Sequence, residues 1–182
     1  NPVHTIGRQV AEPLHLHRGM NAAAARTAAI ALLDRVGIPN AAPRFDAYPH
    51  QFSGGQRQRI TIAMALACGP DLLIADEPTT ALDVTVQQQI LYLISDLVAE
   101  RSMALILISH DLGVISQNAD RMLVMYGGSV VESGPTEAVF ATMAHPYTRG
   151  LFAARPQLVP HRRGERPRLA TIAGTVPELA HL

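Results

Sequence analysis

Hydrophobic positions recur with helical spacing along residues 1–69. The apolar residues of the first segment are four positions apart and share one helix face, at Ile6, Val10 and Leu14. This spacing predicts a helix over residues 5–16 with Thr5 as its N-cap. A second helix is predicted over residues 22–36, because Asn21 can cap its start and Gly37 can end it.

Near-continuous apolar runs replace this pattern after residue 70. Residues 72–75 and 104–108 are runs of the kind found in parallel strands that are covered on both faces. A helical stripe of apolar residues lies between them over residues 86–98, and Asp83 is placed to cap that helix. A strand, a helix and a strand in this order predict a βαβ unit with a right-handed crossover.

Two further elements are predicted toward the C-terminus. Residues 122–126 and 129–132 are separated by two glycines, which predicts a hairpin. Pro146 is suited to the first turn of another helix. Residues 155–168 contain three prolines and five arginines. They are interpreted as a solvated linker, with contact to anionic lipid headgroups or to a neighbouring subunit as the alternative.

Composition narrows the class of protein. The chain has 182 residues, 48% of them hydrophobic, which allows one core of ordinary size. It has neither an uninterrupted apolar run of about eighteen residues, as a membrane span requires, nor a signal-peptide pattern at its start. Cys68 is the lone cysteine, which excludes an internal disulfide. These features together predict a soluble cytosolic protein. The net charge is zero, which weakly disfavours nucleic acid as the main partner.

Candidate chemistry lies at three places in this pattern. Ser-Gly-Gly at residues 53–55 opens a helix predicted over residues 55–67, so backbone N–H groups and the positive end of a helix dipole face any anion in front of them. The strand over residues 72–75 leads into Asp76 and Glu77, a metal-binding carboxylate beside a possible general base. The next strand leads into Ser109 and His110. Because ligands bind beyond the carboxyl ends of parallel strands, these side chains are expected to line one crevice.

In this order, residues 52–59, 72–78 and 81–83 resemble the signature motif, the Walker B motif and the D-loop of the ATP-binding cassette (ABC) ATPases. The resemblance implies an α/β fold: a partial P-loop NTPase core with a helical signature subdomain and a C-terminal extension. We expect three regions. They are a helical subdomain with the signature motif, the C-terminal part of the ATPase core, and an extension of the peptide-importer type, over residues 1–69, 70–133 and 134–182.

The resemblance also implies roles for individual residues. Asp76 would help to hold Mg²⁺, and Glu77 would orient and activate the attacking water. His110 matches the switch histidine that contacts the γ-phosphate of ATP, and Asp83 matches the D-loop residue that communicates across a dimer. Simpler interpretations stay open: a helix cap for Asp83, a surface histidine for His110 and a solvated charge for Glu77. The signature residues would bind, in trans, a nucleotide held by a partner subunit: Ser53, Gly54, Gly55 and Gln56.

The P-loop of these ATPases is missing from the chain. All fifteen basic residues are arginine, and no lysine is present to reach the β- and γ-phosphates. A start at Asn1 rather than Met fits a C-terminal fragment, with the glutamine-bearing loop expected before Asn1. We expect the chain alone to be inactive as an ATPase and marginally stable, with an exposed apolar sheet face.

The C-terminal part is similar to one branch of the family. Residues 145–149 and 151–154, with residues 172–177 and 1–7, resemble the oligopeptide/dipeptide importers, a branch that includes nickel and glutathione systems. This implies an ATP-binding and ATP-hydrolysing subunit of an importer for peptides or related small solutes.

Such a subunit would be peripheral on the inner face of the cell membrane. It would work with a second ABC ATPase subunit, two integral membrane permease subunits and, indirectly, a substrate-binding protein, using ATP and Mg²⁺. The alternatives are a soluble ABC-type ATPase of translation or DNA repair, and a truncated non-catalytic structural or regulatory remnant.

Overall fold

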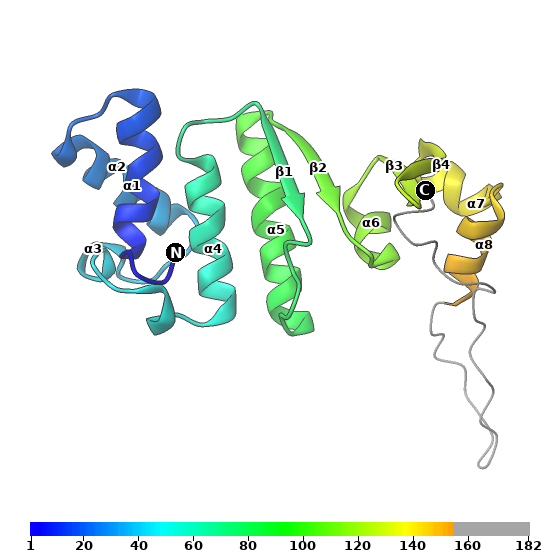
Figure 1. The fold of residues 1–182 in the computed structure, drawn as a ribbon, viewed down its shortest axis with the longest axis horizontal. Coiled ribbons are helices and arrows are strands. Elements are labelled where there is room, and N and C mark those ends of the chain that lie inside the picture. Colours follow the sequence, from blue (N-terminus) through cyan, green and yellow to red (C-terminus); the bar gives the residue numbers. More distant parts are fainter. Residues whose placement is uncertain (155–182) are drawn as a thin grey trace, which may run out of the picture. The chain divides into compact units, whose positions relative to one another are not determined.

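The computed structural model describes residues 1–154, which belong to two compact units (Figure 1). The first unit runs from Asn1 to His110 and the second begins at Asp111. Whether the chain also divides into domains at residues 69/70 and 133/134 stays a prediction. The predicted linker over residues 155–168 and the motif at residues 172–177 lie outside the described residues. No helix among those described is long and apolar enough to cross a membrane.

The first unit packs helices against a pair of parallel strands. Its helices and strands are, in order, α1 (Ile6–Arg18), α2 (Ala22–Arg35), α3 (Ala41–Arg44), the 3₁₀ turn η1 (Pro49–Gln51), α4 (Gly54–Leu66), β1 (Leu72–Asp76), α5 (Val84–Arg101) and β2 (Ala104–Ile108). Figure 1 shows α4 between α1 and α5. The short elements α3 and η1 were not predicted, because the prolines around them indicated only turns.

The predicted helix caps are present in the structure. The Thr5 hydroxyl accepts a hydrogen bond from the Arg8 N–H, and the Asn21 side chain accepts one from the Ala24 N–H. Helix α1 continues to Arg18, two residues beyond the predicted end, and includes Pro13. The apolar stripe of α1 is buried as its spacing predicted, and it shares one core with residues of α2, α4 and α5, among them Ala29, Leu33, Leu66, Ile90 and Leu97.

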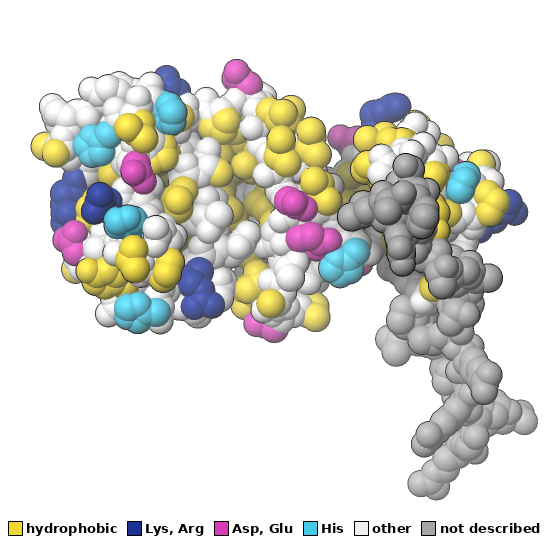
Figure 2. Space-filling view, in the orientation of Figure 1, with side chains coloured by type: hydrophobic (Ala, Val, Ile, Leu, Met, Phe, Trp, Pro, Cys, Tyr) yellow, Lys and Arg dark blue, Asp and Glu magenta, His cyan; other side chains and the backbone are white. Residues whose placement is uncertain are grey.

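The predicted βαβ unit is formed by β1, α5 and β2. The two strands are parallel, and their register pairs Leu72 with Ala104 at one end and Asp76 with Ile108 at the other. Leu73 of β1 is buried in the same core as Ile90 of α5. Among the described residues only one face of the strands is covered, so the apolar runs were wrong in predicting cover on both faces, while the exposed apolar sheet face expected for a chain without the P-loop is present. One face exposes large apolar side chains, visible as a hydrophobic patch in Figure 2: Leu72, Ile74, Ile106 and Ile108.

The second unit contains the predicted hairpin. Strands β3 (Arg121–Tyr126) and β4 (Ser129–Pro135) are antiparallel, and the turn between them is formed by two glycines with positive φ. Helices α6 (Leu112–Asn118), α7 (Thr136–Thr142) and α8 (Pro146–Ala153) complete the described part. The carboxylate of Glu132, on β4, accepts hydrogen bonds from the N–H groups of Ala144 and His145. The motif that begins at His145 therefore has a structural role, because Glu132 holds the start of α8.

Candidate functional site

The carboxyl ends of β1 and β2 bring together three of the predicted site residues, Asp76, Glu77 and His110, which we call the strand-end site. The Glu77 N–H donates to the Ile108 carbonyl at 3.0 Å, so the pairing of the strands extends one residue beyond β1. The backbone of Glu77 has φ +47°, in the left-handed region that non-glycine residues seldom adopt. Such backbone strain costs on the order of 1–3 kcal/mol and is concentrated at functional sites.

Three hydrogen bonds orient the Glu77 carboxylate. Its Oε1 accepts from the His110 N–H at 3.0 Å and lies 2.7 Å from His110 Nδ1. Its Oε2 accepts from the Thr80 hydroxyl at 3.3 Å. The side-chain contact with His110 is the main reason that the pKa of Glu77 lies below its ordinary value. The Glu77 side chain is 33% exposed and that of His110 is 81% exposed, so both can be reached from solvent.

Asp76 is the exposed last residue of β1, directly before Glu77. Carboxylate oxygens are ligands that Mg²⁺ accepts, and protein Mg²⁺ sites often use only one or two carboxylates together with phosphate oxygens and water. Among the described residues, no group of three His, Cys, Asp or Glu side chains could hold a metal ion. A single exposed carboxylate such as that of Asp76 fits a Mg²⁺ ion whose other ligands are phosphate oxygens and water.

The predicted anion site at the start of α4 is a tight local structure, the signature turn, residues 53–56. Ser53 is the N-cap, and its hydroxyl accepts from the Gln56 N–H at 3.3 Å. The Gln56 side chain in return accepts from the Ser53 N–H at 3.1 Å, which completes a capping box. The N–H groups of Gly54 and Gly55 belong to the first turn and have no partner within the helix. They lie at the positive end of the helix dipole, where an anion is stabilised.

Asp83 caps α5, as its position predicted. Its Oδ1 accepts from the Val86 N–H at 3.0 Å. The loop from the strand-end site to this cap has a second strained residue, Ala81, with φ +61°. The carboxylate of Asp83 is thus engaged locally, and its role in communication across a dimer stays a prediction.

Family models match both parts of the chain. The model described as "ABC transporter" matches residues 2–80, and the model described as "Oligopeptide/dipeptide transporter, C-terminal region" matches residues 131–182. The chain belongs to the ABC transporter family. The branch indicated by residues 145–149 is thereby confirmed as well.

Several curated proteins from Brucella species are similar to this ABC chain. A Brucella melitensis protein named for peptide import and ATP binding is 55% identical over 100% of the chain, which covers 54% of that relative. A Brucella abortus protein of the same description is 57% identical over 98% of the chain, which covers 52% of it. The chain spans about half the length of the curated relatives it matches.

Solved structures of ABC cassettes share the fold. One is a dimeric, post-hydrolysis state of an ATP-binding cassette bound to ADP and Pi. It is 30% identical, with a TM-score of 0.65, over 75% of this chain and 58% of that one. A second, titled as the dimeric structure of a bacterial ABC transporter cassette, has a TM-score of 0.64 at the same identity and coverage. The predicted fold, a partial ABC ATPase core of the P-loop NTPase class, is therefore confirmed.

The ABC chain packs its signature turn closely against the segment that carries Asp83. A side chain built on Gly54 would place its Cβ 3.3 Å from Leu82 Cδ2, and one built on Gly55 would place its Cβ 2.6 Å from Val86 Cγ1. Neither this packing nor the contact between Thr80 and Glu77 was predicted. The sequence around Val86 contains no pattern that indicates a contact with Gly55, which is distant from it in the chain.

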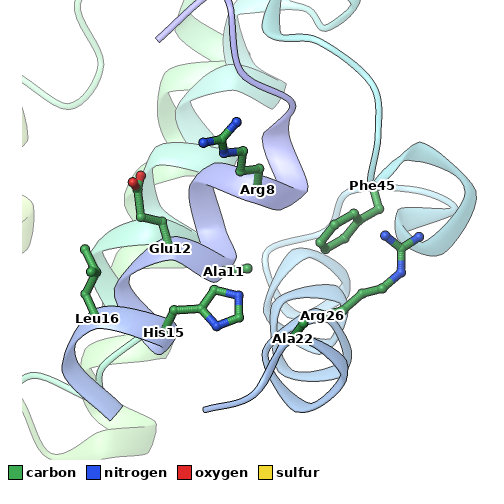
Figure 3. A pocket seen from close by; sticks show the side chains of 8 residues that line it. All are labelled: Arg8, Ala11, Glu12, His15, Leu16, Ala22, Arg26 and Phe45. Atoms are coloured by element: carbon green, nitrogen blue, oxygen red, sulfur yellow. The ribbon is translucent and has the colours of Figure 1, made fainter. Parts of the chain in front are cut away.

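A groove of about 500 Å³ lies between α1 and α2, away from these motifs (Figure 3). Its wall includes the Phe45 ring, over which the Arg26 guanidinium is stacked at 4.0 Å from the ring centroid. Arg26 also pairs with Asp46 at 3.4 Å. The groove contains none of the residues of the strand-end site or the signature turn.

Proposed function

We propose that this chain supplies the γ-phosphate side of an ATP-hydrolysing site and, through its signature turn, part of a second such site on a partner. The observation that supports this proposal best is the Glu77 carboxylate. It is held by His110 at the shared end of two parallel strands, beside the exposed Asp76. General bases of this kind need a fixed orientation as much as a suitable pKa.

Asp76, Glu77 and His110 fit a site for Mg²⁺ and the terminal phosphate of ATP. The chain contains no lysine that could contact the phosphates as the lysine of a P-loop does. Asp76 would hold the Mg²⁺, which neutralises charge on the phosphate oxygens when bound. Glu77 would accept a proton from the attacking water, and the His110 ring would donate a hydrogen bond toward the phosphate. The signature turn would close over a phosphate bound by the partner, with the N–H groups of Gly54 and Gly55 as donors.

The proposed partners follow from the different roles of the strand-end site and the signature turn. A second ABC ATPase subunit is required, because the signature turn and the strand-end site would serve different nucleotides. The dimeric cassette structures and the peptide-import names of the Brucella relatives support a dimer that drives import of peptides or related small solutes. We propose that the dimer docks on two membrane permease subunits at the inner face of the membrane, which receive solute from a substrate-binding protein.

A chimera tests this function. The chain replaces the matching residues of the Brucella melitensis relative, which contributes the remaining length, and ATP hydrolysis is measured. Glu77→Gln should lower hydrolysis by roughly 100- to 10,000-fold, the range of a general base. Equilibrium binding of a fluorescent ATP analogue should persist. Glu137→Gln, an exposed glutamate in the first turn of α7, is the matched control and should leave hydrolysis unchanged.

Two results would contradict the proposal. Undiminished hydrolysis by Glu77→Gln would remove Glu77 from the role of general base. A parental chimera that binds ATP without hydrolysing it would favour the alternative of a non-catalytic remnant. The match of residues 131–182 to the oligopeptide/dipeptide transporter model favours an importer over a soluble ATPase of translation or DNA repair.

A further inference from the structure

The first turn of α4 and the first turn of α5 approach each other at Gly55. A Cβ at this position would lie 2.6 Å from Val86 Cγ1, closer than side-chain carbons pack in real structures. The neighbouring Gly54 is less restricted, because its Cβ would lie 3.3 Å from the terminal Cδ2 of Leu82. At residue 54 a small adjustment of the Leu82 side chain makes room for a Cβ, whereas at residue 55 a larger shift is needed before any larger residue fits.

Backbone conformation does not explain the glycine at residue 55. Gly55 is not among the residues with positive φ, and it is the second residue of a regular helix. Alanine is a better helix former than glycine, so helix propensity alone would favour alanine here. The contact with Val86 is the feature that disfavours alanine.

Val86 is tied to the D-loop as well as to the signature turn. Its N–H donates to Asp83 Oδ1 at 3.0 Å, while its side chain lies against Gly55. Val86 therefore contacts both the signature turn, which is proposed to act on a partner's nucleotide, and Asp83, which the family resemblance predicts to communicate across a dimer.

We infer that Val86 is a positioning residue that holds the signature turn against the D-loop, residues 81–83. Residue 55 is a glycine because the Val86 methyl group occupies the space that a Cβ would need. This inference rests on the proposed function. It assigns Gly55 a packing role in addition to its N–H group. A shift of the Asp83 loop is passed to the signature turn through the Val86 side chain.

A double-mutant cycle in the chimera tests the packing. Gly55→Ala should lower the melting temperature by roughly 5 °C, because the new methyl group overlaps Val86. Val86→Ala should lower it by less, through lost packing. The variant with both substitutions should melt above Gly55→Ala, since the alanine at 55 then occupies the space that Val86 vacates. Gly54→Ala is the matched control, and adding Val86→Ala to it should give no rescue.

ATP turnover is the second measurement, because it distinguishes a positioning role of Val86 from an effect on stability alone. Gly55→Ala should lower kcat by roughly 100-fold, as a misplacement of about 1 Å can do. Adding Val86→Ala should restore turnover to within about tenfold of the parent. The same measurements at varied ATP concentration separate kcat from KM.

The outcomes are decisive. Rescue of both melting temperature and turnover supports the inference. If Val86→Ala does not raise the melting temperature of the Gly55→Ala variant, the inference is wrong. It is also wrong if the melting temperature recovers but turnover does not, because the role of Gly55 in turnover would then be contact with the nucleotide and not packing against Val86. If the parental chimera does not hydrolyse ATP, the proposed function fails, and the melting cycle by itself then decides whether Val86 positions the turn.

Discussion

The strand-end site and the signature turn lie in the same unit but are held in different ways. In the strand-end site, a strained backbone and hydrogen bonds between residues 33 positions apart fix the Glu77 carboxylate against His110. In the signature turn, a capping box within four residues fixes the start of α4, and packing against Val86 sets its position. The first arrangement depends on tertiary structure and charge, and the second on local geometry and shape.

This difference suggests how each region responds to substitution. A change in the strand-end site should alter chemistry and ionisation with little loss of helix stability. A change in the signature turn should alter stability and the engagement of a partner's nucleotide.

After Glu77→Gln, the largest effect is expected from His110→Ala. This substitution removes the side chain that lies 2.7 Å from Glu77 Oε1 and that is proposed to meet the γ-phosphate. Loss of one preorganised donor to a developing charge typically costs about 10²- to 10³-fold in kcat. Steady-state ATP hydrolysis by the chimera measures this loss. His145→Ala, in the second unit, is a comparison histidine, and an equal loss there would show that the effect is not specific to the strand-end site.

Removal of the cap of the signature turn should have a smaller and different effect. Ser53→Ala deletes the hydroxyl that accepts from the Gln56 N–H, and loss of an N-cap costs about 1 kcal/mol of stability. Asn21→Ala removes the equivalent cap of α2 and is a matched control. Both variants should lose similar stability in urea unfolding, while only Ser53→Ala should raise the KM for ATP. A raised KM in both would mean that the signature turn responds to general destabilisation.

The two regions also differ in how far the sequence predicted them. The start of a helix at the Ser-Gly-Gly turn was predicted, whereas the capping box between Ser53 and Gln56 was not, although its Ser-x-x-Gln pattern lies within one turn of the sequence. The grouping of Glu77 with His110 was predicted because parallel strands end at the same edge. The left-handed backbone of Glu77 and its bond to Thr80 were not predicted, because they depend on the path of the loop after β1.

The exposed apolar face of β1 and β2 was expected from the missing P-loop, but not from the apolar pattern of the strands themselves. A run such as residues 104–108 indicates a strand with apolar side chains on both faces, and it does not tell which segment covers each face. In the described residues, α5 covers one face and the other exposes Ile74 and Ile106. Burial beyond α5 therefore depends on residues that the pattern of this chain does not identify.

Backbone strain should be measurable in the loop that follows the strand-end site. Ala81 has φ +61°, a conformation that costs an L-residue about 1–2 kcal/mol and glycine almost nothing. After allowance for the greater freedom of glycine in the unfolded chain, Ala81→Gly should stabilise the chimera by up to about 1 kcal/mol. Ala99→Gly, on the exposed side of α5, is the control and should destabilise it by about 1 kcal/mol. Destabilisation by Ala81→Gly would show that the loop is not strained there.

The smallest effect should be on the ionisation of Glu77. The pKa of its carboxyl lies below the ordinary value, chiefly because of the side-chain contact with His110. A lowered folded-state pKa stabilises the fold at pH values above the unfolded pKa, and this stabilisation is lost as pH falls through the folded pKa. The contribution is modest, because His110 is 81% exposed and solvent screens the contact.

His110→Ala should therefore raise the pKa of Glu77 toward its ordinary value and reduce the loss of stability on acidification. Carboxyl ¹³C chemical shifts of Glu77, followed across an acid titration of both proteins, measure the change. Ser53→Ala should leave the Glu77 titration unaltered, because the signature turn contributes no hydrogen bond to that carboxylate among those that lower its pKa. An equal shift in the two variants would mean that the two regions are electrostatically coupled, and that local capping and the Glu77–His110 contact cannot be varied independently.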